Sequence, residues 1–223
     1  MKNFGKIIAL ILILAMSIPM AVFAADNTQY ADILYGLGLF KGTDNGYELE
    51  KTFTREEAAT VLVRLLGEET NAAKEAYPET FADVKKDRWS FPYVMYCYEN
   101  EITKGTGTDT FSPAQEISAK EFVTLVLRLL GYTGAEPETA LEDCVYANLI
   151  NSETAKELKL SNNFLRNDMV YIVYRSLMTK MKDGIILAQF LADKNIITQN
   201  QAEEFDVYKN AENMDDLLDS LLN

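Results

Sequence analysis

One pattern of apolar and polar positions occurs twice in the chain and returns a third time in weaker form. The copies read TREEAATVLVRLLG at residues 54–67, SAKEFVTLVLRLLG at 118–131 and LRNDMVYIVYRSLM at 165–178. Within each copy, apolar side chains recur every three or four residues, which is the spacing of one face of an α-helix. Because a repeated unit decides the architecture, the pattern predicts an all-α fold built from three related units.

Signals for helix starts and stops accompany the pattern. In an S/T-x-x-E capping box, the hydroxyl and the carboxylate each accept from a backbone N–H at the helix start. Two such boxes are present, Thr54 with Glu57 and Ser118 with Glu121. Both of these copies close on a glycine, the expected helix stop. Leu165 has no capping side chain, so Ser161 and Asn163 are alternative starts for the third helix.

Around these helices, composition divides the chain into units and connections. A shorter apolar segment and a turn-rich loop precede each repeated helix, so each unit is expected to be helix-loop-helix. After residue 182 the pattern changes to a helical pair at 185–194 and 199–208 and an acidic amphipathic helix at 214–222. The expected segments are 1–24, 25–69, 78–132, 138–182 and a C-terminal helical extension at 183–223, with a linker at 70–80.

A motif of the form T-R-A-E, followed by an amphipathic helix ending in R-x-L-G, resembles the S-layer homology module. The second copy is the fullest, with FADV at 81–84, Trp89, and KGTGTDTFSP at 104–113 before SAKE. The resemblance covers residues 29–182, and the third copy is degenerate. It implies a pseudo-threefold bundle of three repeats. It also implies non-covalent anchoring at the bacterial surface to secondary cell-wall polysaccharide, which in this family is often pyruvylated.

The resemblance also implies that the polymer lies in grooves between repeats. Each copy carries a cation in the first turn of its helix, where unsatisfied N–H groups and the helix dipole favour anions. Glycine lets a loop approach a ligand closely, and Thr and Asp side chains bond sugar hydroxyls. The candidate ligand-binding residues are Arg55, Lys120, Arg166, Gly42, Thr43, Asp44, Gly105, Thr106, Asp109 and Trp89.

Each of these candidates has a structural alternative. In these alternatives, the first-turn cations would pair with neighbouring glutamates, the loop residues would form ordinary turns, and Trp89 would pack into the core. Recurrence of a cation in all three copies favours ligand contact. A second set of arginines, near the helix C-termini where cations are stabilising, is interpreted as structural: Arg64, Arg128 and Arg175.

Residues 1–24 have the features of a signal peptide. Lys2 and Lys6 precede an apolar run at 7–16, and Val-Phe-Ala at 22–24 fits a cleavage site. The alternative, an uncleaved membrane anchor, is disfavoured because the run is shorter than the ~20 residues a span needs. We therefore expect a secreted protein at the cell wall, associated with the S-layer and without membrane insertion after cleavage.

Charge narrows the possible partners and chemistries. The chain has 21 basic and 34 acidic residues, a formal charge of −13, and loses two of its lysines with residues 1–24. Such a chain is expected to avoid nucleic acid. It has no histidine, which removes histidine-dependent nucleophilic triads. No cofactor, metal site or enzymatic activity is expected, although Asp44, Asn45 and Asp109 are alternative calcium ligands.

Two further alternatives stay open from the sequence. Cys97 and Cys144 invite a disulfide in an exported protein, yet Leu34 at the aligned position of the first repeat favours two free, merely apolar side chains. The alternative function is a secreted helical protein–protein interaction scaffold that has lost sugar binding. Its expected partner site is the acidic helix at 214–222, whose leucine stripe must be buried against something.

Overall fold

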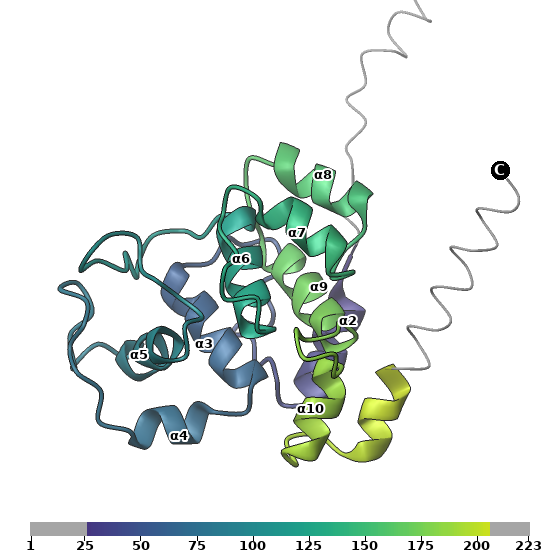
Figure 1. Cartoon of the computed structure of the whole chain (residues 1–223), viewed down its shortest axis with the longest axis horizontal. Helices are drawn as coiled ribbons and strands as arrows, with labels where there is room; N and C mark the ends of the chain where they lie inside the picture. Colours follow the sequence, from purple (N-terminus) through teal and green to yellow (C-terminus); the bar gives the residue numbers. More distant parts are fainter. Residues whose placement is uncertain (1–25, 206–223) are drawn as a thin grey trace, which may run out of the picture.

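A computed structural model describes residues 26–205 of the chain. That part of the chain is all-α (Figure 1). The signal peptide at 1–24 and the acidic helix at 214–222 lie outside the described residues. Residues 199–205 are also helical. The other helices are α2 (Thr28–Gly36), α3 (Arg55–Leu65), α4 (Glu69–Lys74), α5 (Phe91–Glu99), α6 (Ala119–Leu129), α7 (Ala140–Tyr146), α8 (Ser152–Leu160), α9 (Arg166–Leu177) and α10 (Leu187–Asp193).

The three repeated helices are α3, α6 and α9, and they begin at the same point of the pattern. Thr54 and Ser118 form the expected capping boxes. At the third start the Leu165 N–H donates to Asp168 Oδ2 at 2.9 Å, so half of a box remains and α9 begins at Arg166 rather than after Ser161 or Asn163. Glycine stops with positive φ follow α3 and α6, at Gly67 (+70°) and Gly131 (+93°), as expected.

The repeats pack in cyclic order. The second helix of each repeat lies against the first helix of the next: α3 against α5, α6 against α7, and α9 against α2. At the centre, one ring from each repeat meets the other two, with centroids 5.4–5.5 Å apart: Phe53, Phe122 and Phe164. The three units therefore share one core, while the pseudo-threefold symmetry itself stays a prediction.

Two helices depart from the sequence-based expectations. Residues 70–80 were expected to be a linker, but α4 occupies its first part, because Ala72 is buried and Glu69 pairs with Arg64 at 2.8 Å. In the third repeat, α8 takes the place of the expected loop. Asn151 caps it by accepting from the Thr154 N–H at 2.9 Å.

The two cysteines are free and buried. Cys97 donates to the Ala59 carbonyl and Cys144 to the Leu141 carbonyl, at 3.7 and 3.1 Å. Burial raises the pKa of Cys144 to about 12, which keeps this thiol protonated and unreactive. The prediction of free, apolar cysteines is confirmed.

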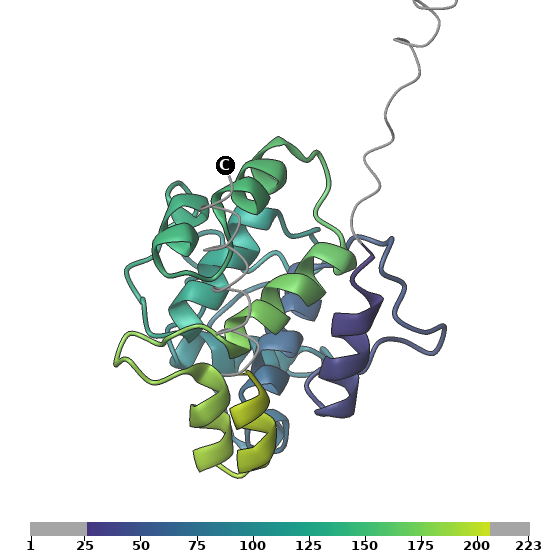
Figure 2. The ribbon, with the colours of Figure 1, turned by 90° about the vertical axis from the view of Figure 1, so that its right-hand side faces the viewer.

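The described part of the C-terminal extension packs on the repeats as a continuation of the same core. The Lys182 N–H donates to the Leu130 carbonyl, and the Phe205 ring lies 5.8 Å from that of Tyr174. Ile196 contacts Gly67 at the end of α3, and α10 and the 199–205 helix lie side by side beneath α9 (Figure 2). Among residues 26–205, no helix has the length and apolar character needed to cross a membrane.

Candidate functional site

Arg55 closes the seam between the first and second repeats. Its side chain is buried, with the residue only 3% exposed. The guanidinium donates to Glu121 Oε1 at 2.9 Å and to the Phe111 carbonyl at 2.8 Å, and it lies 5.0 Å from the centre of the Phe111 ring. Burial lowers the pKa of Arg55 and Glu121 opposes that shift. Its polar head is therefore engaged inside the protein, which supports the structural alternative, and contact of Arg55 with a ligand stays a prediction.

Arg166 makes the corresponding contact between the third and first repeats. It donates to Glu57 Oε1 at 2.6 Å, and only 12% of its side chain is exposed. Glu57 and Glu121 are the capping-box acids of their own helices. An arginine at the start of one repeated helix therefore pairs with the capping acid of the next helix. We name these two contacts, Arg55–Glu121 and Arg166–Glu57, the arginine clasps.

Backbone hydrogen bonds reinforce both clasped seams. The first two amides of α3, at Arg55 and Glu56, donate to the carbonyls of Gln115 and Pro113 at 2.9 and 3.1 Å. Those of α9, at Arg166 and Asn167, donate to the carbonyls of Lys51 and Leu49 at 2.8 and 2.9 Å. The orphan donors at these two helix starts are thus satisfied by the neighbouring repeat.

The third seam, between the second and third repeats, is built differently. Ala119 stands where the other two copies have arginine, so this seam has no clasp. Lys120 stands one position later, where the other copies have Glu56 and Asn167, and it is exposed. The three cations expected from the sequence are therefore not equivalent, which corrects their treatment as one recurring position.

The first two backbone N–H groups of α6 also differ from those of α3 and α9. Among the hydrogen bonds of residues 26–205, none involves the N–H of Ala119 or of Lys120. The carbonyls aligned with those of the other seams belong to Leu160 and Asn162. Leu160 ends α8 and is 72% exposed, and neither carbonyl accepts a backbone hydrogen bond from the start of α6.

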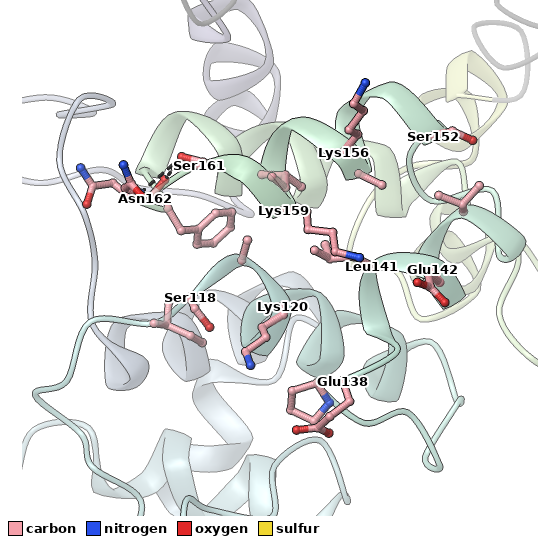
Figure 3. A pocket seen from close by; sticks show the side chains of 18 of the residues that line it. Ser118, Lys120, Glu138, Leu141, Glu142, Ser152, Lys156, Lys159, Ser161 and Asn162 are labelled. Carbon is pink, nitrogen blue, oxygen red and sulfur yellow. Dashed lines mark hydrogen bonds between the residues drawn. The ribbon is translucent and has the colours of Figure 1, made fainter.

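A groove of about 950 Å³ occupies the unclasped seam. We call it the α6–α8 groove, since the start of α6 forms one side, α8 and the chain after it form the other, and α7 lies at one end. Figure 3 shows Lys120 on the α6 side and Lys159 on the α8 side. The six charged residues of the lining balance in sign: Lys120, Lys156 and Lys159 against Glu116, Glu138 and Glu142. In a chain of charge −13, this surface is comparatively favourable for an anion.

Of the ten residues predicted to bind ligand, the structure places Lys120 in this groove and not the others. Sequence reasoning missed the lysines of α8 and Tyr146 at the end of α7, which also line it. Their signal was weak, because α8 itself was not expected and the third copy departs most from the repeated motif. A lysine pair at spacing three, Lys156 and Lys159, on an otherwise polar segment was the available clue.

The loop candidates adopt turn geometry. In the first loop Gly42 has φ +68°, and Thr43 Oγ1 donates to Glu48 Oε2 at 2.8 Å. In the second, Gly105 has φ +80°, and a Cβ there would lie 2.5 Å from the Thr110 carbonyl oxygen. The Thr106 N–H donates to the same carbonyl at 2.8 Å. These contacts support the turn interpretation.

Asp44 and Asp109, the acids of these loops, are exposed. Within residues 26–205 no group of three or more acidic or thiol side chains is placed to hold a metal ion. Contact of any loop candidate with a sugar stays a prediction.

Trp89 is 55% exposed, so the alternative that it packs into the core is wrong. Its ring lies 6.5 Å from Tyr93. The residues on either side of it make the buried contact instead. Arg88 donates two hydrogen bonds to the Glu56 carboxylate, at 2.7 and 2.8 Å, and the Ser90 hydroxyl donates to the same carboxylate at 2.5 Å. Burial raises the pKa of Glu56, but the bonds from Arg88 and Ser90 outweigh it and leave that pKa lowered.

Comparison with known proteins identifies part of the chain. Residues 80–122 match the S-layer homology domain. The chain is 32% identical over 159 residues to the middle cell wall protein of Brevibacillus brevis and 33% identical over 145 residues to the surface layer protein of Brevibacillus choshinensis. It is 32% identical over 108 residues to the cellulosome-anchoring protein of Acetivibrio thermocellus.

These matches cover 66%, 59% and 48% of this chain but only 15%, 13% and 23% of the respective relatives. The chain therefore corresponds to a small part of each relative. The resemblance to the S-layer homology module is confirmed for residues 80–122, while the count of three repeats stays a prediction. The family and these relatives support the expected localisation, secreted and at the cell wall surface.

Proposed function

We propose that this chain, which carries an S-layer homology domain at residues 80–122, anchors to the bacterial cell wall by binding secondary cell-wall polysaccharide in the α6–α8 groove. The domain family and the relatives named as cell-wall, surface-layer and anchoring proteins support the anchoring role. The choice of groove and the acidic, pyruvylated character of the polymer are the finer parts of the proposal.

The observation that carries the choice of groove is the difference between the seams. In two seams, the arginine side chain and the first two N–H groups of the helix already donate hydrogen bonds to the neighbouring repeat, so they are not available to an anion. In the third seam, Ala119 and Lys120 line a groove, and their N–H groups donate no hydrogen bond within residues 26–205. A helix N-terminus with free N–H groups and a nearby cation is suited to hold an anion.

The chemistry fits a carboxylate on a sugar. The amides of Ala119 and Lys120 supply two neutral donors, and the Lys120 ammonium supplies the charge. Hydrogen bonds that involve a charged group contribute about 1.5–3 kcal/mol each. The net negative charge of the chain does not prevent this, because the Debye length at physiological salt is about 8 Å and distant carboxylates are screened.

The arginines then have a different part in the proposal. Arg55 and Arg166 hold the seams and thereby fix the starts of α3 and α9 relative to their neighbours. The loop candidates at 42–44 and 105–109 and the exposed Trp89 are proposed as outlying contacts for a long polymer. The domain family and the S-layer relatives support a non-catalytic module rather than an enzyme.

Lys120→Ala tests the groove directly. Loss of its charged contact is expected to weaken binding to purified secondary wall polymer by about tenfold or more. The melting temperature should be unchanged or slightly raised, because Lys120 is exposed and a cation at a helix N-terminus is unfavourable. Calorimetric titration of the full chain with the polymer, at low and high salt, measures both the affinity and its screening.

Lys86→Ala is the matched control, since Lys86 is exposed and does not line the groove. Equal loss of affinity in both variants would mean that polymer binding depends only on the net charge of the chain, and would contradict binding in this groove. A wild-type chain that is folded but binds no wall polymer would favour the interaction scaffold. Its partner site was predicted at residues 214–222, outside the described part of the chain.

A further inference from the structure

The α6–α8 groove has more surface than a carboxylate needs. Its anion-binding end is at Ser118, Ala119 and Lys120, but the lining continues over an apolar stretch of α7 and α8. The apolar lining residues there are Leu141, Val145, Tyr146, Ala155 and Leu158. A small anion bound at the start of α6 would leave most of the 950 Å³ to water.

Tyr146 is the notable member of this stretch. It is the last residue of α7 and is 86% exposed. Among the ring contacts within residues 26–205, none involves Tyr146, whereas other exposed aromatics such as Tyr35 and Trp89 each face a second ring. A large side chain that contributes so little to the core contributes correspondingly little to stability. Its position on the rim of a groove is therefore better explained by a ligand.

A sugar ring matches this surface. One face of a pyranose is made of C–H groups and packs on an aromatic ring, while the hydroxyls at its edge need donors and acceptors. Lys159 on α8 and Glu142 on α7 line the groove near Leu141 of the apolar stretch and offer both (Figure 3). A lone carboxylate, or an apolar peptide, would use one half of this surface and leave the other unmatched.

We propose that Tyr146 is a stacking platform for a second sugar, so that the groove recognises at least two consecutive units of an acidic polysaccharide. The first unit places its acid group at the start of α6, and the next unit lies on the Tyr146 ring. This inference rests on the proposed function and adds to it the length of ligand that is read and the residue that reads it.

The test is calorimetric titration of the full chain with fragments of purified secondary wall polymer, separated by length into one, two and three sugars, and with sodium pyruvate as a bare carboxylate. Tyr146→Ala is expected to weaken binding of the longer fragments by about tenfold, from the lost stacking and burial. It should leave the shortest fragment and pyruvate nearly unchanged. Tyr146→Phe should retain binding, because the ring and not the hydroxyl carries the contact.

Tyr35→Ala is the control, as Tyr35 is an exposed tyrosine on α2 outside the groove lining. If Tyr146→Ala binds every fragment as the wild type does, the platform is refuted while groove binding stands. If Tyr146→Ala loses affinity equally for pyruvate and for long fragments, the platform is also refuted, because the effect would not depend on a second sugar. Absence of wild-type binding to any fragment refutes the proposed function itself, and the platform with it.

Discussion

Replacement of Arg55 by alanine separates the two roles considered for this residue. As a ligand contact, Arg55 would be needed for binding and dispensable for folding. As the clasp between the first and second repeats, it is needed for stability and dispensable for the α6–α8 groove, which lies at another seam. The structure favours the second role, since the guanidinium is buried against Glu121 and Phe111.

The size of the effect follows from what the truncation leaves behind. Removing one partner of a buried ion pair costs about 3–5 kcal/mol, because the other charge stays buried without compensation. Here Glu121 is 23% exposed and keeps its bonds to the Ser118 N–H and hydroxyl, so the low end applies, about 3 kcal/mol. For a chain of this size, 1 kcal/mol shifts the melting temperature by about 2–4 °C. The expected drop is therefore about 6–12 °C.

Thermal and urea unfolding of the full chain measure this cost, with Lys41→Ala as the matched control. Lys41 also makes an ion pair, to Glu69 at 2.9 Å, but 58% of its side chain is exposed, so its loss should change stability little. A double-mutant cycle with Glu121→Gln isolates the coupling, because glutamine keeps the capping box. Wall-polymer binding by folded Arg55→Ala should equal that of the wild type.

The opposite result would contradict a structural role for Arg55. If Arg55→Ala is no less stable than Lys41→Ala and loses polymer binding, the clasp is unimportant and the role expected from the sequence is restored. Loss of both properties at a temperature where the variant is fully folded would mean that the first seam also binds polymer.

Two other predictions concern the packing of the extension and the pH dependence of stability. Gly67→Ala should lower the free energy of unfolding by about 2–3 kcal/mol, since φ is +70° and the added Cβ would lie 2.5 Å from Ile196. Gly38→Ala, at φ +73° with open space around it, should lower it by only about 1 kcal/mol in the same urea unfolding experiment. Equal losses would show that Ile196 does not pack against residue 67. Burial raises the pKa of Asp168, so its charged form opposes folding at neutral pH and this penalty fades as the pH falls through the folded-state pKa. Asp168→Asn, which keeps an acceptor for the Leu165 N–H, should therefore melt higher than wild type at pH 7 and equally in acid, and a difference that grows as the pH falls would contradict the assignment.

The repeated helices could be predicted from the sequence by local rules. Apolar spacing, the boxes at Thr54 and Ser118, and the stops at Gly67 and Gly131 are decided by residues close together in the chain, and all were recovered. The start of α9 was uncertain only because Leu165 cannot cap. There Asp168 supplies the carboxylate half of the capping box, which a search for Ser or Thr at the cap overlooks.

The candidate site was harder to predict because it depends on which repeat touches which. Arg55 and Lys120 look alike as first-turn cations, yet one is buried in a clasp and the other faces a groove. The difference arises from Ala119 occupying the arginine position and from α8 replacing a loop, and both matter only across a seam. Cyclic pairing of each arginine with the next capping acid was available from the aligned motifs only once the order of repeats in space was known.

Cosedimentation of the protein with isolated cell-wall sacculi, before and after extraction of the secondary polymer, tests directly whether the chain anchors through wall polysaccharide. We expect the wild-type chain to pellet with intact sacculi and to stay in the supernatant once the polymer is removed. Lys120→Ala should pellet less than Lys86→Ala at equal concentration. Pelleting that survives complete removal of the polymer, or a folded wild-type chain that never pellets, would contradict the claim that this module anchors through wall polysaccharide.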